Sequence, residues 1–170
     1  MGNDKLAHDI ALAAALTAAL KSGATSVAYT QMQQYIETYI PLKLFTITTI
    51  DLDNSRAKRL YSSDPESYAI GGFKDIEQNS WSNHVVTRQK PFIANSISEL
   101  SKVFFDHELI ESLGLGSVIN WPVVFNKQVV GTINLLAGEG AYNKDYFSIL
   151  EALYPWFLAL FLVSIEKKES

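Results

Sequence analysis

The stretch that decides the fold runs from residue 116 to residue 137 and reads GSVINWPVVFNKQVVGTINLLA. β-Branched and apolar residues dominate it, which is typical of two strands, at 116–125 and 129–137. In both strands the odd positions are apolar: Ile119, Trp121, Val123, Phe125, Val129, Ile133 and Leu135. If these side chains share one face, Phe125 lies opposite Val129 across a three-residue loop at 126–128. The same register places Asn120 opposite Asn134 on the other face.

A second pair of strands precedes this hairpin. Residues 43–51 are rich in β-branched and apolar types, and residues 57–63 return as a strand after a turn at 51–55. In the first of them Phe45 and Ile47 point to one side, and Thr46 and Thr48 point to the other. The pattern therefore predicts a sheet with one apolar face and one mixed face.

Helical periodicity marks residues 5–21, 25–39 and 143–167. The first helix has a face of small side chains that allows a close approach by another helix: Ala7, Ala11, Ala14, Ala15 and Ala18. The last helix is apolar on two opposite sides, and Pro155 is expected to kink it. Such a helix needs two partners. One is the sheet, and the other is the first helix, its copy in a second chain, or both.

The segment from residue 64 to residue 90 is long and irregular but carries several aromatic residues, among them Tyr68 and Trp81. A long segment of this kind in a compact domain is often a lid over a binding site. The alternative is a plain core plug under a loop. Residues 81–89 fit a short helix before Pro91.

Composition limits the possible functions. The chain has 170 residues, a net charge of −4 and no cysteine. We expect one domain over residues 1–170, with an N-terminal helix at 1–24 that serves as a dimerisation element through its small residues, and a core at 25–167. No basic run supports a nucleic-acid partner. The apolar runs at 10–20 and 156–163 are too short or wrongly flanked for a membrane partner or signal peptide, so we expect a cytoplasmic protein.

No pattern of a known catalytic, metal or cofactor site stands out. The chain lacks a Gly-x-Ser-x-Gly elbow, and the absence of cysteine removes thiolate ligands and nucleophiles. Residues 106–108, Asp-His-Glu, do not face one point on a helix, and an acidic first turn capped by Asp106 accounts for them. Gly71 and Gly72 lack the spacing of a phosphate loop. We expect no catalytic residue, no metal and no cofactor.

Polar groups on the mixed face are the candidate ligand-binding residues. Asn120 and Asn134 need partners, because a buried amide left unpaired costs about 1–3 kcal/mol. Each amide is satisfied either by the other or by a ligand. The full candidate set consists of Thr46, Thr48, Arg59, Tyr61, Tyr68, Trp81, Asn120 and Asn134. For the aromatic members simple packing is the alternative, and for Arg59 it is a solvated edge position.

The arrangement resembles a GAF domain from about Thr25 to Ile165. The motif is Ser117, four residues, Pro122, and Gly131 nine residues further on. Residues 59–72, RLYSSDPESYAIGG, are similar to one group of stand-alone bacterial GAF proteins. The resemblance implies an α+β fold with a central antiparallel sheet. Terminal helices would cover one face, and a ligand pocket with a lid would lie on the other.

The resemblance does not extend to known GAF chemistry. Some small GAF proteins are free methionine-(R)-sulfoxide reductases that use cysteines, and the positions that grip substrate there match Val118, Asn134 and Leu136, none of them acidic. The chain offers no cysteine for the attachment of a bilin, and it shows no signature of cyclic-nucleotide binding.

Three functions remain open at this point. The first is a homodimeric sensor that binds an unknown small metabolite under the lid and passes its signal to a separate partner protein. The second is a ligand-free interaction module built on the first and last helices. The third is a cysteine-free enzyme, for which loss of turnover in His84→Ala would be the signature.

Overall fold

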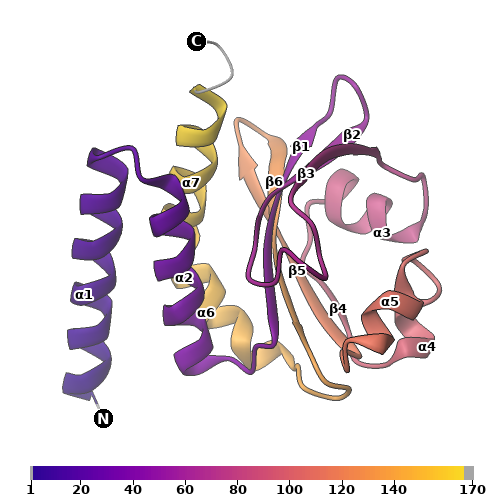
Figure 1. Cartoon of the computed structure of the whole chain (residues 1–170), viewed down its shortest axis with the longest axis horizontal. Helices are drawn as coiled ribbons and strands as arrows, with labels where there is room; N and C mark the ends of the chain where they lie inside the picture. The colour runs from indigo at the N-terminus through magenta and orange to yellow at the C-terminus, as the bar shows by residue number, and fades with distance from the viewer. Residues whose placement is uncertain (1, 167–170) are drawn as a thin grey trace.

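The computed structural model describes residues 2–166, which form one sheet with helices on both faces (Figure 1). The strands are β1 (Leu44–Asp51), β2 (Arg56–Ser62), β3 (Gly71–Asp75), β4 (Phe92–Ala94), β5 (Ser117–Phe125) and β6 (Gln128–Ala137). The helices are α1 (Gly2–Lys21), α2 (Thr25–Tyr39), α3 (Ser80–Ser82), α4 (Ile97–Leu100), α5 (His107–Ser112), α6 (Phe147–Ala152) and α7 (Tyr154–Glu166). Two further helical turns are η1 (Asn83–Thr87) and η2 (Lys144–Tyr146).

The strands follow the order β3-β2-β1-β6-β5-β4, and all neighbouring pairs are antiparallel. Asn120 lies opposite Asn134 at the centre of the β5–β6 pair, as the alternation predicts. A sheet of this kind can bury both faces when helices cover them. The predicted α+β architecture, a central antiparallel sheet with the terminal helices on one face, is confirmed.

The turn between β5 and β6 differs from the prediction. Phe125 pairs with Gln128 rather than with Val129, so the three-residue loop is wrong. Asn126 and Lys127 form a two-residue turn with φ values of 50° and 67°, a geometry that matches the twist of the strands. A β-bulge near the end of β5 restores the register, and Phe125 remains 44% exposed instead of joining the apolar face.

Helices α2, α6 and α7 cover the apolar face of the sheet (Figure 1). The core between these layers contains Met32, Ile36, Phe45, Ile47, Ile119, Trp121, Val123, Ile133, Leu135, Leu150, Phe157 and Phe161. Burying one such side chain contributes about 1.5–3 kcal/mol, so this layer supplies most of the stability. The alternation in the strands predicted this face correctly.

Helix α1 packs on α2 and forms the outermost layer (Figure 1). Its larger side chains Leu12 and Leu16 are buried there, whereas Ala7, Ala11 and Ala14 are exposed. Burial of the leucine face removes more apolar area from water than burial of the alanine face would, and this explains why the leucine face packs on α2. The second neighbour of α7 is α2, so the prediction of α1 in that role is wrong within this chain. A copy of α1 from a second chain stays a prediction.

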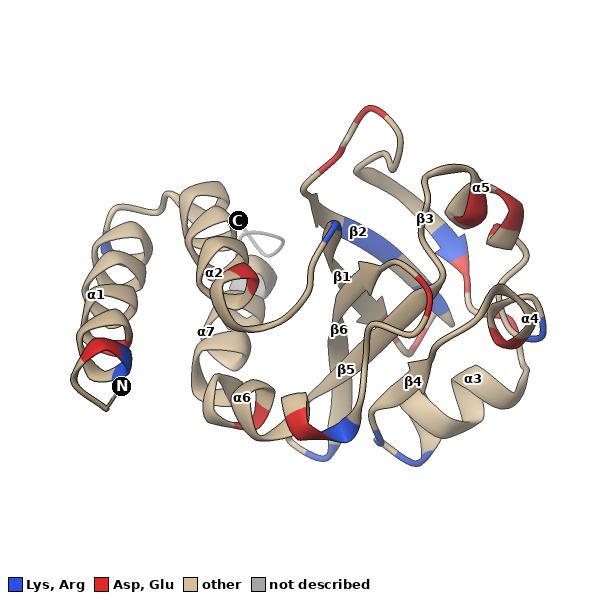
Figure 2. Ribbon diagram, turned by 90° about the horizontal axis from the view of Figure 1, so that it is seen from below, with Lys and Arg blue, Asp and Glu red and all other residues tan. Residues whose placement is uncertain are grey.

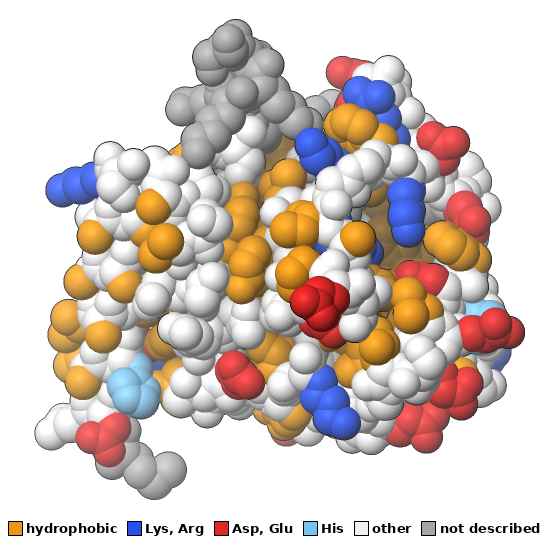
Figure 3. Space-filling model, in the orientation of Figure 1, with side chains coloured by type: hydrophobic (Ala, Val, Ile, Leu, Met, Phe, Trp, Pro, Cys, Tyr) orange, Lys and Arg blue, Asp and Glu red, His pale blue; other side chains and the backbone are white. Residues whose placement is uncertain are grey.

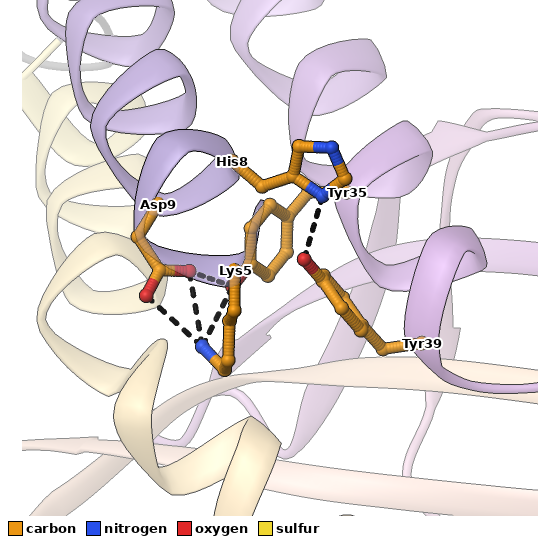
Figure 4. A network of polar contacts seen from close by, with 5 residues as sticks. All are labelled: Lys5, His8, Asp9, Tyr35 and Tyr39. Carbon is orange, nitrogen blue, oxygen red and sulfur yellow. Dashed lines mark hydrogen bonds and ion pairs between the residues drawn. The ribbon is translucent and has the colours of Figure 1, made fainter. Parts of the chain in front are cut away.

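Polar contacts also hold α1 on α2 (Figure 4). Lys5 Nζ lies 3.0 Å from a carboxylate oxygen of Asp9, which also accepts a hydrogen bond from the Tyr35 hydroxyl. His8 Nδ1 and the Tyr39 hydroxyl are 2.7 Å apart. The hydrogen bonds from Tyr35 and Lys5 lower the pKa of Asp9. The Lys5–Asp9 ion pair lies within α1 and is exposed, so it adds little stability, and the hydrogen bonds of Tyr35 and Tyr39 make the contact between the two helices.

The last helix is broken into α6 and α7. The two segments, Lys144–Ala152 and Tyr154–Ser164, meet at 59°, which confirms the kink expected from Pro155. Residue 167 of the predicted helix lies outside the described residues. Among residues 2–166 no single helix is long and apolar enough to cross a membrane. The bent pair reaches that length and composition together, but Leu150, Phe157 and Phe161 from it are buried in the core.

The mixed face of the sheet is covered by residues between β2 and β5. A second apolar cluster lies there and contains Leu44, Ala94, Leu100, Ile110, Leu115, Val118 and Leu136. The Asn79 side chain caps α3 by accepting hydrogen bonds from the backbone N–H groups of Trp81 and Ser82. The helix predicted at 81–89 is therefore present as α3 and η1, and it begins at Ser80.

Candidate functional site

The two central asparagines bind each other. Asn120 Nδ2 donates to Asn134 Oδ1 at 2.7 Å, and both residues are buried. Asn134 Nδ2 in turn donates to the hydroxyl oxygens of Thr46 and Thr48, at 3.1 and 3.3 Å. Four of the predicted site residues therefore form one connected cluster on β1, β5 and β6. In this structure the amides satisfy one another, which is one of the two alternatives that the sequence leaves open.

Trp81 connects the covering segment to this cluster. Its indole Nε1 donates to Asn120 Oδ1 at 2.9 Å. The Trp81 ring also packs against Phe104, with centroids 6.0 Å apart, and Phe104 packs edge-on against Phe92. The parts of the 64–90 segment that carry Tyr68 and Trp81 thus lie over the mixed face, whereas residues 71–75, predicted as irregular, extend the sheet as β3. The sequence does not reveal Phe92 and Phe104 as partners, since no spacing relates them to Trp81.

Arg59 and Tyr68 lie together at the β2–β3 side of the same face. The Arg59 guanidinium stacks on the Tyr68 ring, 4.0 Å from its centroid, and donates to the Ala69 carbonyl at 2.6 Å. The Tyr68 hydroxyl donates to the Asp106 carboxylate. Asp106 begins α5 without a side-chain cap bond, so its predicted capping role is replaced by this contact.

The electrostatics of this corner follow from burial. Burial lowers the pKa of Arg59, while the pKa of Tyr68 is raised, first by burial and then by the negative charge of Asp106. The Nε atom of Arg59 is buried and has no hydrogen-bond partner among the described residues. A buried, unpaired N–H on a cation is costly, and an anion placed there would remove that cost.

The structure places Tyr61 apart from the other seven candidates. It lies opposite Ile47 on the helical side, and its hydroxyl donates to Gln33 Oε1 at 2.7 Å. The cause is a shift in the β1–β2 ladder: Tyr61 pairs with Ile47, but Arg59 already pairs with Thr48. The extra residue, Leu60, turns Arg59 and Tyr61 to opposite faces.

Neither of two hollows in the surface is lined by the asparagine pair. One, of about 550 Å³, runs beside β4, and the other, of about 310 Å³, lies where β1 ends and β6 begins. In residues 2–166 no three His, Asp or Glu side chains are placed to hold a metal ion. His107 of the Asp-His-Glu run lies 2.9 Å from the Phe104 carbonyl through its Nδ1.

Comparison with models of protein families gave no match, and comparison with curated proteins gave none either. Solved structures do match. The GAF domain of an Acinetobacter phosphoenolpyruvate-protein phosphotransferase has a TM-score of 0.73 and 13% identity, with 100% of both chains covered. The GAF domain of a two-component sensor histidine kinase from Bacillus halodurans has a TM-score of 0.66 and 17% identity, covering 83% of this chain and 95% of that one.

The chain has the GAF fold. A further match with this fold is a type II free methionine-R-sulfoxide reductase from Thermoplasma acidophilum, with a TM-score of 0.61 and 14% identity, over 81% of this chain and 93% of the other. GAF domains thus occur both in a sensor kinase and as a reductase. At these identities the likeness establishes the fold alone, and the function has to be argued from the site.

Proposed function

We propose that this GAF domain is a sensor that performs no chemistry of its own. It binds a small polar or amphipathic metabolite between the mixed sheet face and residues 64–90, works as a homodimer, and passes its signal to a separate protein. The observation that carries the proposal is the hydrogen bond from Trp81 to Asn120. Because this bond ties Trp81 to the sheet, the position of the covering segment depends on whether Asn120 accepts a hydrogen bond from Trp81 or from a ligand.

A ligand enters by replacing hydrogen bonds rather than by filling an empty cavity. A molecule that donates one hydrogen bond takes the place of the indole at Asn120 Oδ1. Such an exchange changes the free energy by only about 0.5–1.5 kcal/mol per bond, because no buried group is left unpaired. Trp81 is then released, and with it the segment that includes α3 and η1. A neutral pair of amides suits this exchange, since no charge must be desolvated.

Arg59 selects the ligand by charge. Its ring partner Tyr68 holds the guanidinium plane, and the buried Nε–H has no partner among residues 2–166. The Nε and terminal N–H groups of arginine form a fork that fits a carboxylate or phosphate. The favoured ligand therefore combines an acidic group near Arg59 with a hydrogen-bond donor near Asn120.

The absence of catalysis is also part of the proposal. A reductase with this fold is known, but the chemistry expected for that branch needs cysteine, and this chain contains none. In the described part of the chain, the histidines nearest to the sheet contact backbone carbonyls: His84 lies 2.9 Å from Pro91 O, and His107 lies 2.9 Å from Phe104 O. Neither imidazole forms a hydrogen bond with a serine, threonine or lysine side chain of residues 2–166.

The test is native mass spectrometry of freshly purified protein, under gentle and then denaturing conditions. The wild type is expected to release a small molecule of defined mass. Arg59→Gln is expected to lose about tenfold or more in ligand occupancy, because a charge-assisted contact is removed. Arg88→Gln changes the same side chain at an exposed position and should retain the ligand.

Asn120→Leu with Asn134→Leu gives a second comparison. Replacing both amides by apolar groups removes their mutual hydrogen bond at little net cost, and the Trp81 N–H left without its partner costs about 1–3 kcal/mol, less than the stability of a typical domain. The double variant should therefore fold and release no ligand. A wild type with no adduct and no thermal shift across a panel of carboxylate and phosphate metabolites would contradict the sensor proposal.

The same negative result would support the second candidate, a ligand-free interaction module. One observation favours that alternative: the amide cluster is satisfied within the chain, and neither hollow lies over it. In that case residues 64–90 serve as a core plug, and the helical layer alone carries the function.

The homodimer rests on the outer side of α1. Leu6 and Ile10 are 59% and 62% exposed there, next to the exposed Ala7, Ala11 and Ala14. Figure 3 shows orange side chains along the length of this helix. An apolar strip on a surface helix favours association, and a two-fold axis lets the same strip meet its own copy.

A further inference from the structure

The 550 Å³ groove beside β4 lies outside the site under the lid. It is lined by Ser80, His84, Lys90, Pro91, Phe92, Ile93, Lys144 and Phe147. These residues come from α3, η1, the approach to β4, β4 itself, η2 and the start of α6, so the groove follows the outer edge of β4. The sheet order places β4 at the end of the sheet, with β5 as its one strand neighbour.

An edge strand offers backbone groups to a partner. In an antiparallel pair, alternate residues direct both N–H and C=O away from the neighbouring strand. Over Phe92–Ala94, at least one residue must therefore direct both groups away from β5, toward the outer edge that the groove follows. The side chains of Ile93 and Phe147 supply an apolar floor beside this edge. The combination is the one that accepts an added strand.

The charges of the groove are one-sided. Lys90 and Lys144 line it, and no aspartate or glutamate does, although the chain as a whole carries a net charge of −4. Figure 2 shows blue segments beside the start of α6 and below β4. Neither lysine forms an ion pair with another of residues 2–166. Two unpaired ammonium groups at the rim attract acidic side chains and repel basic ones.

His84 forms one wall of the groove and carries no negative charge. Its Nε2 lies 2.9 Å from the Pro91 carbonyl, an acceptor, so Nε2 carries the proton. The imidazole also packs edge-on against Phe92, with centroids 6.4 Å apart. The wall is therefore held in place against the strand edge that it borders.

We propose that this groove binds an extended acidic peptide segment of another protein, which adds a strand to β4 and places carboxylates near Lys90 and Lys144. The openness of the groove favours a peptide over a small molecule. All eight lining residues are exposed or partly exposed, whereas small-ligand sites enclose most of their ligand. The inference does not depend on a ligand under the lid.

The experiment is an NMR titration of the full, ¹⁵N-labelled chain with an acetylated decapeptide of alternating Glu and Val, up to about 1 mM, where weak binding is visible. We expect shifts in the amide signals of β4 and not of β3, the opposite edge. A decapeptide of alternating Lys and Val should give none. The Glu-Val peptide methylated on every second backbone nitrogen should also fail, because it cannot form the ladder.

Charge reversal supplies the matched variants. Lys90→Glu with Lys144→Glu should weaken binding by about fivefold or more, since two attractions become repulsions. Lys102→Glu, an exposed lysine outside the groove, should leave it unchanged. The proposal is overturned if the Glu-Val peptide causes no shifts at β4 or if charge reversal has no effect. It is also overturned if free glutamate at equal carboxylate concentration gives the same shifts, since the groove would then be a small-anion site.

Discussion

Trp81 reaches from α3 to the sheet and donates its indole N–H to Asn120 at 2.9 Å. Trp81→Phe keeps an aromatic ring against Phe104 but removes this donor. The buried Oδ1 of Asn120 then lacks one partner, at a cost of about 1–3 kcal/mol. We expect hydrogen exchange of the amides in η1 to accelerate about tenfold or more, because each 1.4 kcal/mol changes the opening equilibrium tenfold. Exchange measured by mass spectrometry tests this.

The control at this scale is Trp156→Phe. Trp156 lies on α7, on the far side of the sheet. Its indole N–H does not donate to Asn120, as that of Trp81 does. It removes the same atoms without touching the lid, so exchange in η1 should stay as in the wild type. If both variants accelerate exchange equally, the Trp81 hydrogen bond does not hold the lid.

At the scale of elements, Gly131 shows why the hairpin and α7 fit together. A Cβ added there would lie 2.2 Å from a ring carbon of Phe161 and 2.4 Å from the Thr48 carbonyl oxygen. Backbone on one side and a buried ring on the other leave no room to adjust. Gly131→Ala should lower the free energy of unfolding by about 3 kcal/mol and the melting temperature by about 5–10 °C. Urea and thermal unfolding measure both.

Gly138→Ala is the matched change, seven residues further along the chain and just past the end of β6. Its Cβ would meet nothing within 4 Å, so its stability should stay within about 0.5 kcal/mol of the wild type. Equal losses in the two variants would mean that the close approach of Phe161 and Thr48 is not what requires glycine at position 131, since the effect of alanine on the unfolded chain alone is stabilising. The motif that links Ser117, Pro122 and Gly131 in the sequence thus acquires a physical reason at its glycine.

The same elements show what the sequence can and cannot predict. Strict alternation in β5 and β6 predicted the buried face and the Asn120–Asn134 pair, because a one-residue slip would have exposed the whole apolar set. It failed for Tyr61, since one extra residue in β2 reverses the face and bulges have no marker in the sequence. It also missed Asp106 as the partner of Tyr68, a contact made only when two distant loops meet.

At the scale of the whole molecule, the layers place the candidate lid and the proposed dimer surface at opposite ends (Figure 1). The segment that carries Trp81, residues 76–90, lies over one face of the sheet, while α1 is separated from the other face by α2 and α7. A signal from the lid would therefore reach a second chain through the sheet and the helical layer. For this route the outer side of α1 must be an interface.

Ile10→Glu tests that interface without disturbing the core. Ile10 is 62% exposed, so the substitution should leave the fold and melting curve of the single chain intact. A carboxylate at the centre of an apolar contact loses its water and finds no cation, which should weaken dimerisation by about tenfold or more. Light scattering across a dilution series measures this. Gln34→Glu adds the same charge at an exposed position on α2 and should leave the dimer intact. A wild type that stays monomeric at every concentration would refute the dimer, and a dimer unaffected by Ile10→Glu would place its interface elsewhere.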